Sequence, residues 1–251
     1  MNQEKHWNRI GTKYSQEIFD VFASDKEQKL SAYFKKHASM KHSAIDFGCG
    51  TGKAFRYMSP SFSRVLAIDI SSELLDQASR NAYKNITYKQ ADLTSDNLVF
   101  PPTDFVFCCN VLLLPEADKD FAMMKNIYKA LRIDGVSLVI VPSLESVLFS
   151  SWRLVDWYKK EGVTAAEIPA DELAYYKPGV RSLVQGVVQI DKVPTKHYSA
   201  PELQILFSRA GLKITALEKL EYHWNTEFDS PPAWMKAPYP WDWLIECKKE
   251  K

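Results

Sequence analysis

The sequence lacks long apolar runs. No segment reaches the roughly 18 consecutive apolar residues that a membrane-spanning helix needs. The first residues, Met-Asn-Gln-Glu-Lys-His-Trp, also lack the apolar core of a signal peptide. We therefore expect a cytoplasmic protein that is not inserted in a membrane.

An excess of charge of either sign is also missing. The 251 residues include 32 Lys and Arg against 31 Asp and Glu, which gives a net charge of +1. Because proteins that bind nucleic acids over a broad face carry a marked basic excess, this balance argues against such a face. The cysteines show no C-x-x-C spacing and are predicted to be reduced thiols without a metal: Cys49, Cys108, Cys109 and Cys247.

A short apolar run followed by three alternate glycines stands at residues 43–52, Ser-Ala-Ile-Asp-Phe-Gly-Cys-Gly-Thr-Gly. The run predicts a buried strand with Asp46 near its carboxyl end, and a helix is predicted over Lys53–Met58. Glycines between a strand and a helix let the backbone turn tightly and leave no Cβ between the main chain and a ligand. Unpaired N–H groups at the helix start favour a polar ligand there. The stretch therefore predicts a nucleotide-type site.

The spacing of the glycines narrows the choice of nucleotide. The dinucleotide fingerprint G-x-G-x-x-G would need a glycine where Lys53 stands. A phosphate loop would need a glycine in place of Phe47 and a Ser or Thr in place of Ala54. The pattern that remains, D-x-G-x-G-x-G, resembles motif I of the class I S-adenosylmethionine-dependent methyltransferases.

Polar residues follow where this resemblance expects them. A second buried strand ends at Asp69, 17 residues beyond Gly52 (69 − 52). A carboxylate at that point can accept hydrogen bonds from both hydroxyls of a ribose. A third strand is predicted to end at Asp92 and Leu93, and a fourth at Asn110, before an apolar loop.

The resemblance implies that the cofactor is S-adenosylmethionine and indicates which residues hold it. In the family, the acid after the third strand approaches the adenine amino group, and adenine packs against the residue after the ribose acid, here Ile70. An N-terminal tyrosine seven residues after a tryptophan often lies near the methionine end of the cofactor. Tyr14 fits this pattern, with helix packing as the alternative, while Trp7 is predicted to lie in the core. The implied cofactor-binding residues are Tyr14, Asp46, Gly48, Cys49, Gly50, Gly52, Asp69, Ile70, Asp92, Leu93 and Asn110.

A glycine and a capping box predict where two helices in the second half of the chain end or begin. The helix before the fifth strand is predicted to end with Gly135 in the left-handed position just past its last turn. A capping box, Ser199–Glu202, predicts a helix that closes at Gly211. Strands are then predicted over 212–222 and 241–248, and the family resemblance implies that the last one is antiparallel to the rest.

The segment after the fifth strand does not fit a simple βα repeat. A helical stripe runs from residue 144 to Gly162, a second short helix is predicted over 166–176, and 183–192 is predicted to be extended. An insertion at the carboxyl ends of parallel strands lies where such sheets bind ligands. We therefore expect 144–198 to form a cap over an acceptor site, with a packing subdomain as the alternative. Its candidate acceptor-binding residues are Trp152, Trp157 and Tyr198.

No metal and no single indispensable base are expected. Metal-dependent members of this fold place acids at the ends of strands four and five, whereas the loop after Asn110 is apolar here. Many relatives carry a histidine about where Leu114 stands. The remaining candidates for a general base are His197 and His223, although a lone histidine beside aromatic residues is more often a packed or surface residue.

Together these patterns predict one α/β domain. We expect a Rossmann-like, seven-stranded, mostly parallel sheet with helices on both faces and a helical cap insertion after strand five. The single domain (1–251) would consist of N-terminal helices (1–40), a cofactor-binding core (41–143), the cap (144–198), and a C-terminal helix with the last two strands (199–251). The predicted reaction is methyl transfer to an O, N, S or C nucleophile of a small-molecule acceptor. The alternatives are an RNA-modifying methyltransferase and a catalytically silent cofactor-binding partner subunit.

Overall fold

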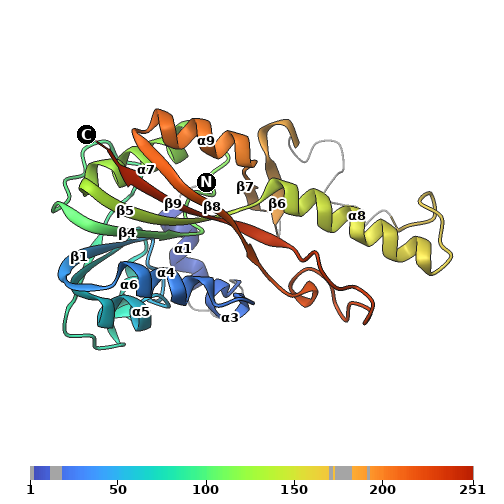
Figure 1. The fold of residues 1–251 in the computed structure, drawn as a ribbon, viewed down its shortest axis with the longest axis horizontal. Helices are drawn as coiled ribbons and strands as arrows, with labels where there is room; N and C mark the ends of the chain where they lie inside the picture. Colours follow the sequence, from blue (N-terminus) through green and yellow to red (C-terminus); the bar gives the residue numbers. More distant parts are fainter. Residues whose placement is uncertain (1–2, 12–18, 170–171, 173–182, 191–192, 251) are drawn as a thin grey trace.

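A seven-stranded sheet lies at the centre of the molecule, with the strand order β3-β2-β1-β4-β5-β9-β8 (Figure 1). The computed structural model describes residues 3–11, 19–169, 172, 183–190 and 193–250. Neighbouring strands from β3 to β5 are parallel, and β9 runs antiparallel to both β5 and β8. The predicted sheet and its antiparallel last strand are confirmed. The strands are β1 Ser39–Phe47, β2 Phe62–Asp69, β3 Ile86–Gln90, β4 Thr103–Cys109, β5 Leu131–Pro142, β8 Leu212–Glu221 and β9 Trp241–Lys249.

Helices cover both faces of this sheet, as predicted. Figure 1 shows α4, α5 and α6 on one side of the strands and α7 and α9 on the other. Each group packs into its own cluster of buried side chains. The helices are α1 Gln3–Gly11, α3 Val21–Ser24, α4 Lys29–His37, α5 Phe55–Ser61, α6 Ser72–Ser79, α7 Ala117–Ala130, α8 Leu144–Lys160 and α9 Ala200–Arg209, with short 3-10 turns η2 Leu183–Gln185 and η3 Trp224–Thr226.

The central strand β4 shows why the sheet needs cover on both faces. Phe105 and Phe107 belong to the cluster under α4 and α5, whereas Val106 and Cys108 belong to the cluster under α7 and α9. Successive side chains of a strand point to opposite faces, so an uninterrupted apolar run fills two cores. This packing fixes the register of the strands and brings their carboxyl ends to one edge.

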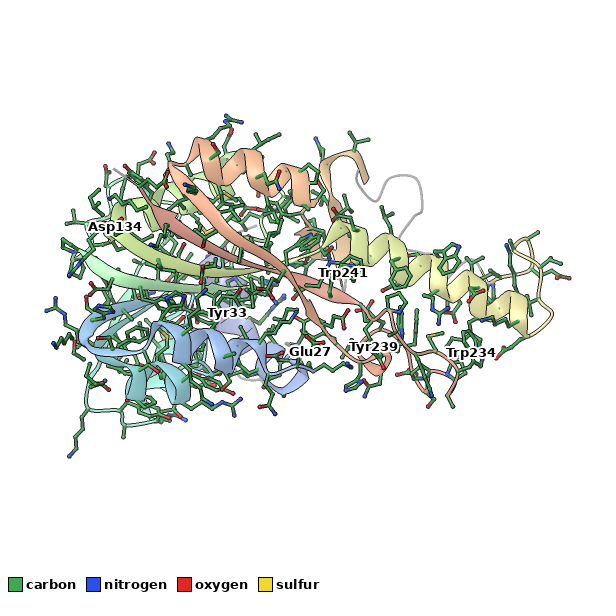
Figure 2. The ribbon with its side chains drawn as sticks, in the orientation of Figure 1. Glu27, Tyr33, Asp134, Trp234, Tyr239 and Trp241 are labelled. Carbon is green, nitrogen blue, oxygen red and sulfur yellow. The ribbon has the colours of Figure 1, made fainter. Side chains whose placement is uncertain are left out.

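The helix α8 extends away from the sheet, and the excursion of residues 223–240 returns beside it (Figure 1). The ring of Trp157 on α8 lies 6.0 Å from that of Phe228, and Lys160 Nζ lies 3.7 Å from the ring centroid of Trp234. Figure 2 labels Trp234 and Tyr239 along this excursion and Trp241 where it enters β9. Aromatic and cation–π contacts therefore join the excursion to α8.

The three- and four-residue spacing of apolar residues from Trp7 to Val21 predicts a single first helix, which is too long. In the structure α1 ends at Gly11, and Val21 belongs to the separate helix α3. Asp20 starts α3 because its Oδ1 accepts hydrogen bonds from the backbone N–H groups of Phe22 and Ala23, both at 3.1 Å. Tyr14 lies outside the described residues.

The prediction for Gly135 is wrong. The helix α7 ends earlier, at Ala130, and the left-handed residue is Asp134, with φ +63°. Position 135 requires glycine for a steric reason, because a Cβ there would lie 2.8 Å from the carbonyl oxygen of Arg132. The glycine therefore allows close backbone approach rather than the capping turn.

The cap differs in part from its prediction. The long helix is confirmed as α8, but residues 165–167 form turns rather than the start of a second helix, and most of 170–182 lies outside the described residues. The segment predicted as extended contains η2 and strand β6, Val187–Ile190, which pairs antiparallel with β7, Val193–Lys196. Backbone pairing within this two-stranded sheet was not visible in the sequence pattern.

Candidate active site

A large cleft of about 1550 Å³ opens at the carboxyl edge of the parallel strands. Open parallel sheets bind ligands at this edge, where the chain leaves the strands in loops. Eight of the predicted cofactor residues line the cleft: Asp46, Gly48, Cys49, Asp69, Ile70, Asp92, Leu93 and Asn110. Gly50 and Gly52 lie in the turn without being among the lining residues, and Tyr14 lies outside the described residues.

The glycine turn is held against strand β2. The backbone N–H groups of Gly48 and Cys49 both donate to the carbonyl oxygen of Ile68, at 2.8 and 3.0 Å. Gly48 has φ +69°, and a Cβ there would lie 2.3 Å from Cγ2 of Val111. Both the dihedral angle and this contact require glycine, so the turn keeps its backbone open toward the cleft. The helix predicted to begin at Lys53 starts two residues later, at Phe55.

Asp69 lies at the tip of β2 and is 6% exposed. Its carboxylate accepts hydrogen bonds from Gly50 N at 2.8 Å and from Ser71 N at 2.9 Å. Burial raises the pKa of Asp69, and these two hydrogen bonds oppose the rise. The same carboxylate therefore fixes the glycine turn and the start of α6, where Ser71 is the cap.

Asp46, on the neighbouring strand, is 2% exposed, and its Oδ2 has no hydrogen-bond partner among the described residues. Burial and then the nearby charge of Asp69 raise the pKa of Asp46 to about 8. Oδ1 of Asn110, across the cleft edge, is likewise buried without a partner. Buried polar atoms are rarely left unpaired, so both atoms point to a ligand that supplies hydrogen-bond donors. The ammonium group at the methionine end of S-adenosylmethionine fits this requirement.

The residues predicted to lie on the adenine side are Asp92 and Leu93, just beyond the end of β3, and Ile70. The strand ends at Gln90, so Asp92 stands in the following turn rather than in the strand as predicted. It is exposed and accepts hydrogen bonds from Thr94 N at 2.9 Å and Thr94 Oγ1 at 2.7 Å. Leu93 is buried, whereas Ile70 is half-buried, so Ile70 presents apolar surface to the cleft that it lines.

The rest of the cleft is formed by elements far apart in the sequence: α1, the start of α8, the β6–β7 pair, and the ends of β8 and β9. Trp7, predicted to lie in the core, is half-buried and lines this cleft. The position of α1 explains the difference, because this helix packs against α6 beside the cofactor residues.

Asp242 and Tyr222 are among the polar lining residues that sequence reasoning missed. The Tyr222 hydroxyl donates to Asp242 Oδ2 at 2.8 Å, and Asn110 also hydrogen-bonds to this carboxyl group. Burial raises the pKa of Asp242 to about 6, and the two hydrogen bonds limit the rise. Asp242 reaches the cleft because antiparallel pairing sets it opposite Pro142, at the carboxyl end of β5. No local pattern marks this position.

The two histidine candidates are separated by the fold. His197 lines the cleft and is 5% exposed, with Nδ1 3.1 Å from the carbonyl oxygen of Thr195. Because a carbonyl oxygen only accepts, Nδ1 carries the proton and Nε2 is the acceptor. Burial lowers the pKa of His197 to about 4, so the ring is neutral near pH 7 and a weak base. His223 is exposed, packs edge-on against Tyr239, and is not among the lining residues.

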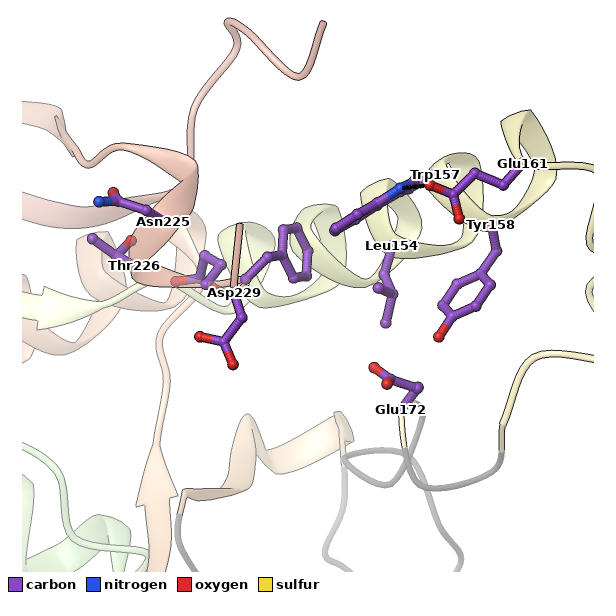
Figure 3. A pocket seen from close by; sticks show the side chains of 10 residues that line it. Leu154, Trp157, Tyr158, Glu161, Glu172, Asn225, Thr226 and Asp229 are labelled. Atoms are coloured by element: carbon purple, nitrogen blue, oxygen red, sulfur yellow. Dashed lines mark hydrogen bonds between the residues drawn. The ribbon is translucent and has the colours of Figure 1, made fainter. Parts of the chain in front are cut away.

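The candidate acceptor residues also differ in placement. Tyr198 is 1% exposed and donates to Asp120 Oδ2 at 2.5 Å, inside the cluster under α7 and α9. Trp152 is 58% exposed and stacks on Phe149. Trp157 lines a second cavity, described below, and its Nε1 donates to Glu161 (Figure 3).

The second cavity, of about 420 Å³, lies between α8 and residues 225–229 (Figure 3). Its lining combines aromatic rings with carboxyl groups and includes no Lys or Arg among the described residues. Thr226 and Glu227 line both this cavity and the large cleft. The acidic lining is Glu161, Glu172, Glu227 and Asp229, and the aromatic lining is Trp157, Tyr158 and Phe228.

Neither cavity contains a cluster of metal-ligating side chains among the described residues. Within the described part of the chain, no three His, Cys, Asp or Glu side chains gather closely enough to hold a metal ion. All four cysteines are free thiols. No helix in the described ranges is both long enough and apolar enough to cross a membrane.

Comparison with known proteins agrees with this site. Residues 44–135 match a family model described as a methyltransferase domain. The malonyl-[acyl-carrier protein] O-methyltransferase of Enterobacter lignolyticus (strain SCF1) is 29% identical over 114 residues, which are 45% of this chain and 44% of that protein. The chain therefore matches less than half the length of this curated relative.

Two solved structures share the fold. A SAM-dependent methyltransferase from Methanosarcina mazei has a TM-score of 0.62 at 15% identity, over 87% of this chain and 97% of that one. The DhpI–SAH complex has a TM-score of 0.61 at 17% identity, over 99% and 95% of the two chains.

The strand order, the glycine turn and its two buried carboxyl groups define a Rossmann-like domain built for a nucleoside cofactor. The family match over residues 44–135 covers the core of that site and identifies this part of the chain as a methyltransferase domain.

Proposed function

We propose that this protein transfers the methyl group of S-adenosylmethionine to an O, N, S or C nucleophile of a small-molecule acceptor. The observation that carries the proposal is the cleft that contains Asp46 and Asp69 at the ends of adjacent strands, with one carboxylate oxygen of Asp46 unpartnered. Its volume of about 1550 Å³ exceeds the roughly 300–1000 Å³ of a typical ligand site, which leaves room for an acceptor beside the cofactor.

The residues of this chain would bind and orient the two reactants. Asp69 would accept from the ribose hydroxyls, Asp92 would approach the adenine amino group, and Ile70 would pack against the adenine ring. Asp46 and Asn110 would pair with the methionine end. The cofactor, when bound, supplies an electrophilic methyl group on a sulfonium sulfur. The protein then contributes by alignment and by exclusion of water, which can supply much of the rate enhancement of such a reaction.

A small acceptor is supported by where the cap begins. Ser143, Ser146 and Val147, at the start of α8, line the cleft together with the β6–β7 pair. We propose that segment 144–198 covers the acceptor in the way a lid does. The near-neutral net charge of +1 gives no support to a broad RNA-binding face.

Calorimetry with the isolated chain tests the cofactor. S-adenosylmethionine and S-adenosylhomocysteine are expected to bind, whereas NAD and ATP are not. Binding of NAD alone would refute the argument from the glycine spacing.

A screen of metabolite classes and of RNA for release of S-adenosylhomocysteine then tests the acceptor. Turnover with a metabolite is the expected result. Turnover with RNA alone would favour the RNA-modifying alternative, and cofactor binding without any turnover would favour a silent partner subunit.

A further inference from the structure

The acceptor half of the cleft is built from the ends of β8 and β9, the turn η3, the start of α8 and the β6–β7 pair. It adjoins the cofactor half at Asn110, which hydrogen-bonds to Asp242. Asp242 therefore lies next to a residue that the proposed function places at the methionine end of the cofactor. A group bound to Asp242 would lie beside the reactive methyl group.

Among the described residues, the charged side chains that line this acceptor half have one sign. Asp242 and Glu227 are its carboxyl groups. Of the described residues that line the whole cleft, only Arg9 and Lys53 are Lys or Arg, and both lie on the cofactor side. Arg9 is on α1, which packs against α6, and Lys53 forms an ion pair with Asp20 at 2.9 Å.

His197 does not supply a positive charge either. Its pKa is lowered by burial to about 4, so the imidazole is neutral near pH 7. An anionic acceptor would therefore lose its hydration without meeting a compensating cation among the described lining residues of this half, which opposes its binding. A cationic acceptor would meet a carboxylate in a largely buried site, where charge-assisted hydrogen bonds are strong.

Aromatic side chains surround this carboxylate. The ring of Tyr222 is tied to Asp242 through its hydroxyl group, and Trp241 is 7% exposed and also lines the cleft. The indole Nε1 of Trp241 has no partner among the described residues. Carboxylates combined with aromatic rings are the groups with which proteins recognise amines. An unpaired buried donor is a separate indication that a polar ligand completes this site.

We propose that Asp242, held by Tyr222 and Asn110, is the acceptor-binding carboxylate, and that the acceptor presents a basic nitrogen to it rather than a carboxylate. This inference rests on the proposed function. The carboxyl-lined second cavity, which shares Thr226 and Glu227 with the cleft, continues the same charge pattern for the rest of such an acceptor (Figure 3).

The proton and electron balance follows from this pairing. The protonated acceptor nitrogen passes one proton to Asp242. Its freed lone pair attacks the methyl carbon, a C–N bond forms, and the C–S bond breaks with its electron pair remaining on sulfur. The positive charge moves from sulfur to nitrogen. With a pKa near 6, Asp242 is a better proton acceptor near neutral pH than His197, whose pKa is about 4.

Calorimetry with two probes of similar size and opposite charge tests the proposal. The full chain is saturated with S-adenosylhomocysteine, and 2-phenylethylamine is compared with 3-phenylpropionate near about pH 7.5. The wild type is expected to bind the amine at least about tenfold more tightly than the carboxylate. Equal or tighter binding of phenylpropionate would overturn the proposal without any variant.

Two variants test whether Asp242 is the residue that binds the amine. Asp242→Asn keeps the shape of the side chain and is expected to weaken amine binding at least about tenfold while the dissociation constant of S-adenosylhomocysteine stays within about twofold. Asp76→Asn, on the exposed face of α6, is the matched control and should change neither value. Unchanged amine binding in Asp242→Asn would refute the assignment. Failure of the wild type to bind S-adenosylhomocysteine would refute the proposed function instead.

The pH dependence supplies a second readout. Asp242 is faced by Tyr222, Asn110, Cys109 and Glu227. The amine stays protonated below neutral pH, so its affinity should fall as the pH drops through about 6 and Asp242 is neutralised. This fall should be smaller in Asp242→Asn, in which only Glu227 remains to titrate. Identical pH profiles for the two proteins would contradict the proposal.

Discussion

Asp46 and Asp69 are two buried carboxyl groups at the ends of adjacent parallel strands, yet their surroundings differ. Asp69 accepts hydrogen bonds from two backbone N–H groups, while Asp46 retains an oxygen without a partner among the described residues. The hydrogen bonds of Asp69 oppose the rise in its pKa that burial causes, whereas Asp46 has an unmet need for a donor or a cation. The two residues are expected to respond differently to substitution.

Asp69→Ala is expected to weaken binding of S-adenosylhomocysteine by about 1.5–3 kcal/mol, the range for hydrogen bonds to a charged group. This is roughly a ten- to more than hundredfold loss of affinity. The reason is the loss of both the ribose contact and the support of the Gly50 turn. Calorimetry measures the change, with Asp76→Ala as an exposed control. An unchanged dissociation constant in a folded variant would exclude the ribose role.

Asp46 is expected to make the ligand-free protein less stable as the pH rises. Its folded-state pKa is raised from 3.8 to about 8, so the folded state holds the proton more tightly than the unfolded chain. The stabilisation is fully present below the unfolded pKa and is lost as the pH rises through the folded one. The loss is at most about 1.4 kcal/mol per pH unit in this window.

Urea unfolding at about pH 6 and about pH 8 measures this loss, and the comparison is with Asp46→Asn, which cannot ionise. Burial raises the pKa of Asp120 to about 7 and of Asp242 to about 6, so these groups contribute with the same sign in both proteins. The free energy of unfolding should therefore decline more in the wild type by about 2 kcal/mol. An equal decline would show that Asp46 is already ionised in the folded protein.

At the scale of elements, α8 connects the cleft with the second cavity. Its first turn lines the cleft, and its last two turns line the smaller cavity through Leu154, Trp157 and Tyr158. The excursion 223–240 packs against the same helix and carries Glu227 into both cavities. A change on one face of α8 should therefore affect acceptor binding, while a change on its exposed face should not.

Trp157→Ala is expected to raise the Michaelis constant of the acceptor more than that of the cofactor, because Trp157 lines the second cavity and contacts Phe228. Trp152→Ala, on the same helix but with a 58% exposed side chain, provides the matched comparison and should have the smaller effect. Steady-state kinetics with the acceptor found by the metabolite screen measures both constants. Equal effects on acceptor and cofactor would favour a packing role for this helix.

At the scale of the whole molecule, the sheet order brings the strand ends of the core and of the C-terminal segment to one cleft. Two reactants can then be aligned in it by side chains from both ends of the chain. Alignment of the reactants can lower an activation barrier by about 7–11 kcal/mol. This is more than a general base contributes, since a base typically raises the rate by roughly 10²–10⁴-fold. The apolar loop after Asn110 supplies no acidic group before Glu116.

If alignment rather than a metal provides the catalysis, as we propose, methyl transfer is expected to survive treatment with EDTA, with a rate within about twofold of the untreated protein. The release of S-adenosylhomocysteine from the identified acceptor reaction measures the rate. Loss of activity with EDTA that Mg²⁺ restores would show that the cleft holds a metal site absent from the side-chain clusters of the described residues.

The sequence by itself determined the cofactor half of this protein. The alternate glycines and the acids at strand ends are local patterns, because each depends on a turn or a strand end that neighbouring residues specify. For this reason the turn at Gly48, the position of Asp69 at the end of a strand and the parallel direction of the core strands could be predicted. Whether the predicted side chains contact the cofactor remains a prediction.

Only the tertiary structure decided which residues form the acceptor half. Asp242 and Tyr222 reach the cleft because β9 inserts antiparallel between β5 and β8, a pairing between segments about 100 residues apart that no local pattern encodes. Packing likewise placed Trp7 at the cleft and buried Tyr198 beneath α7 and α9. Composition and spacing report which side chains are apolar, but long-range strand pairing and helix packing determine which of them contact one another.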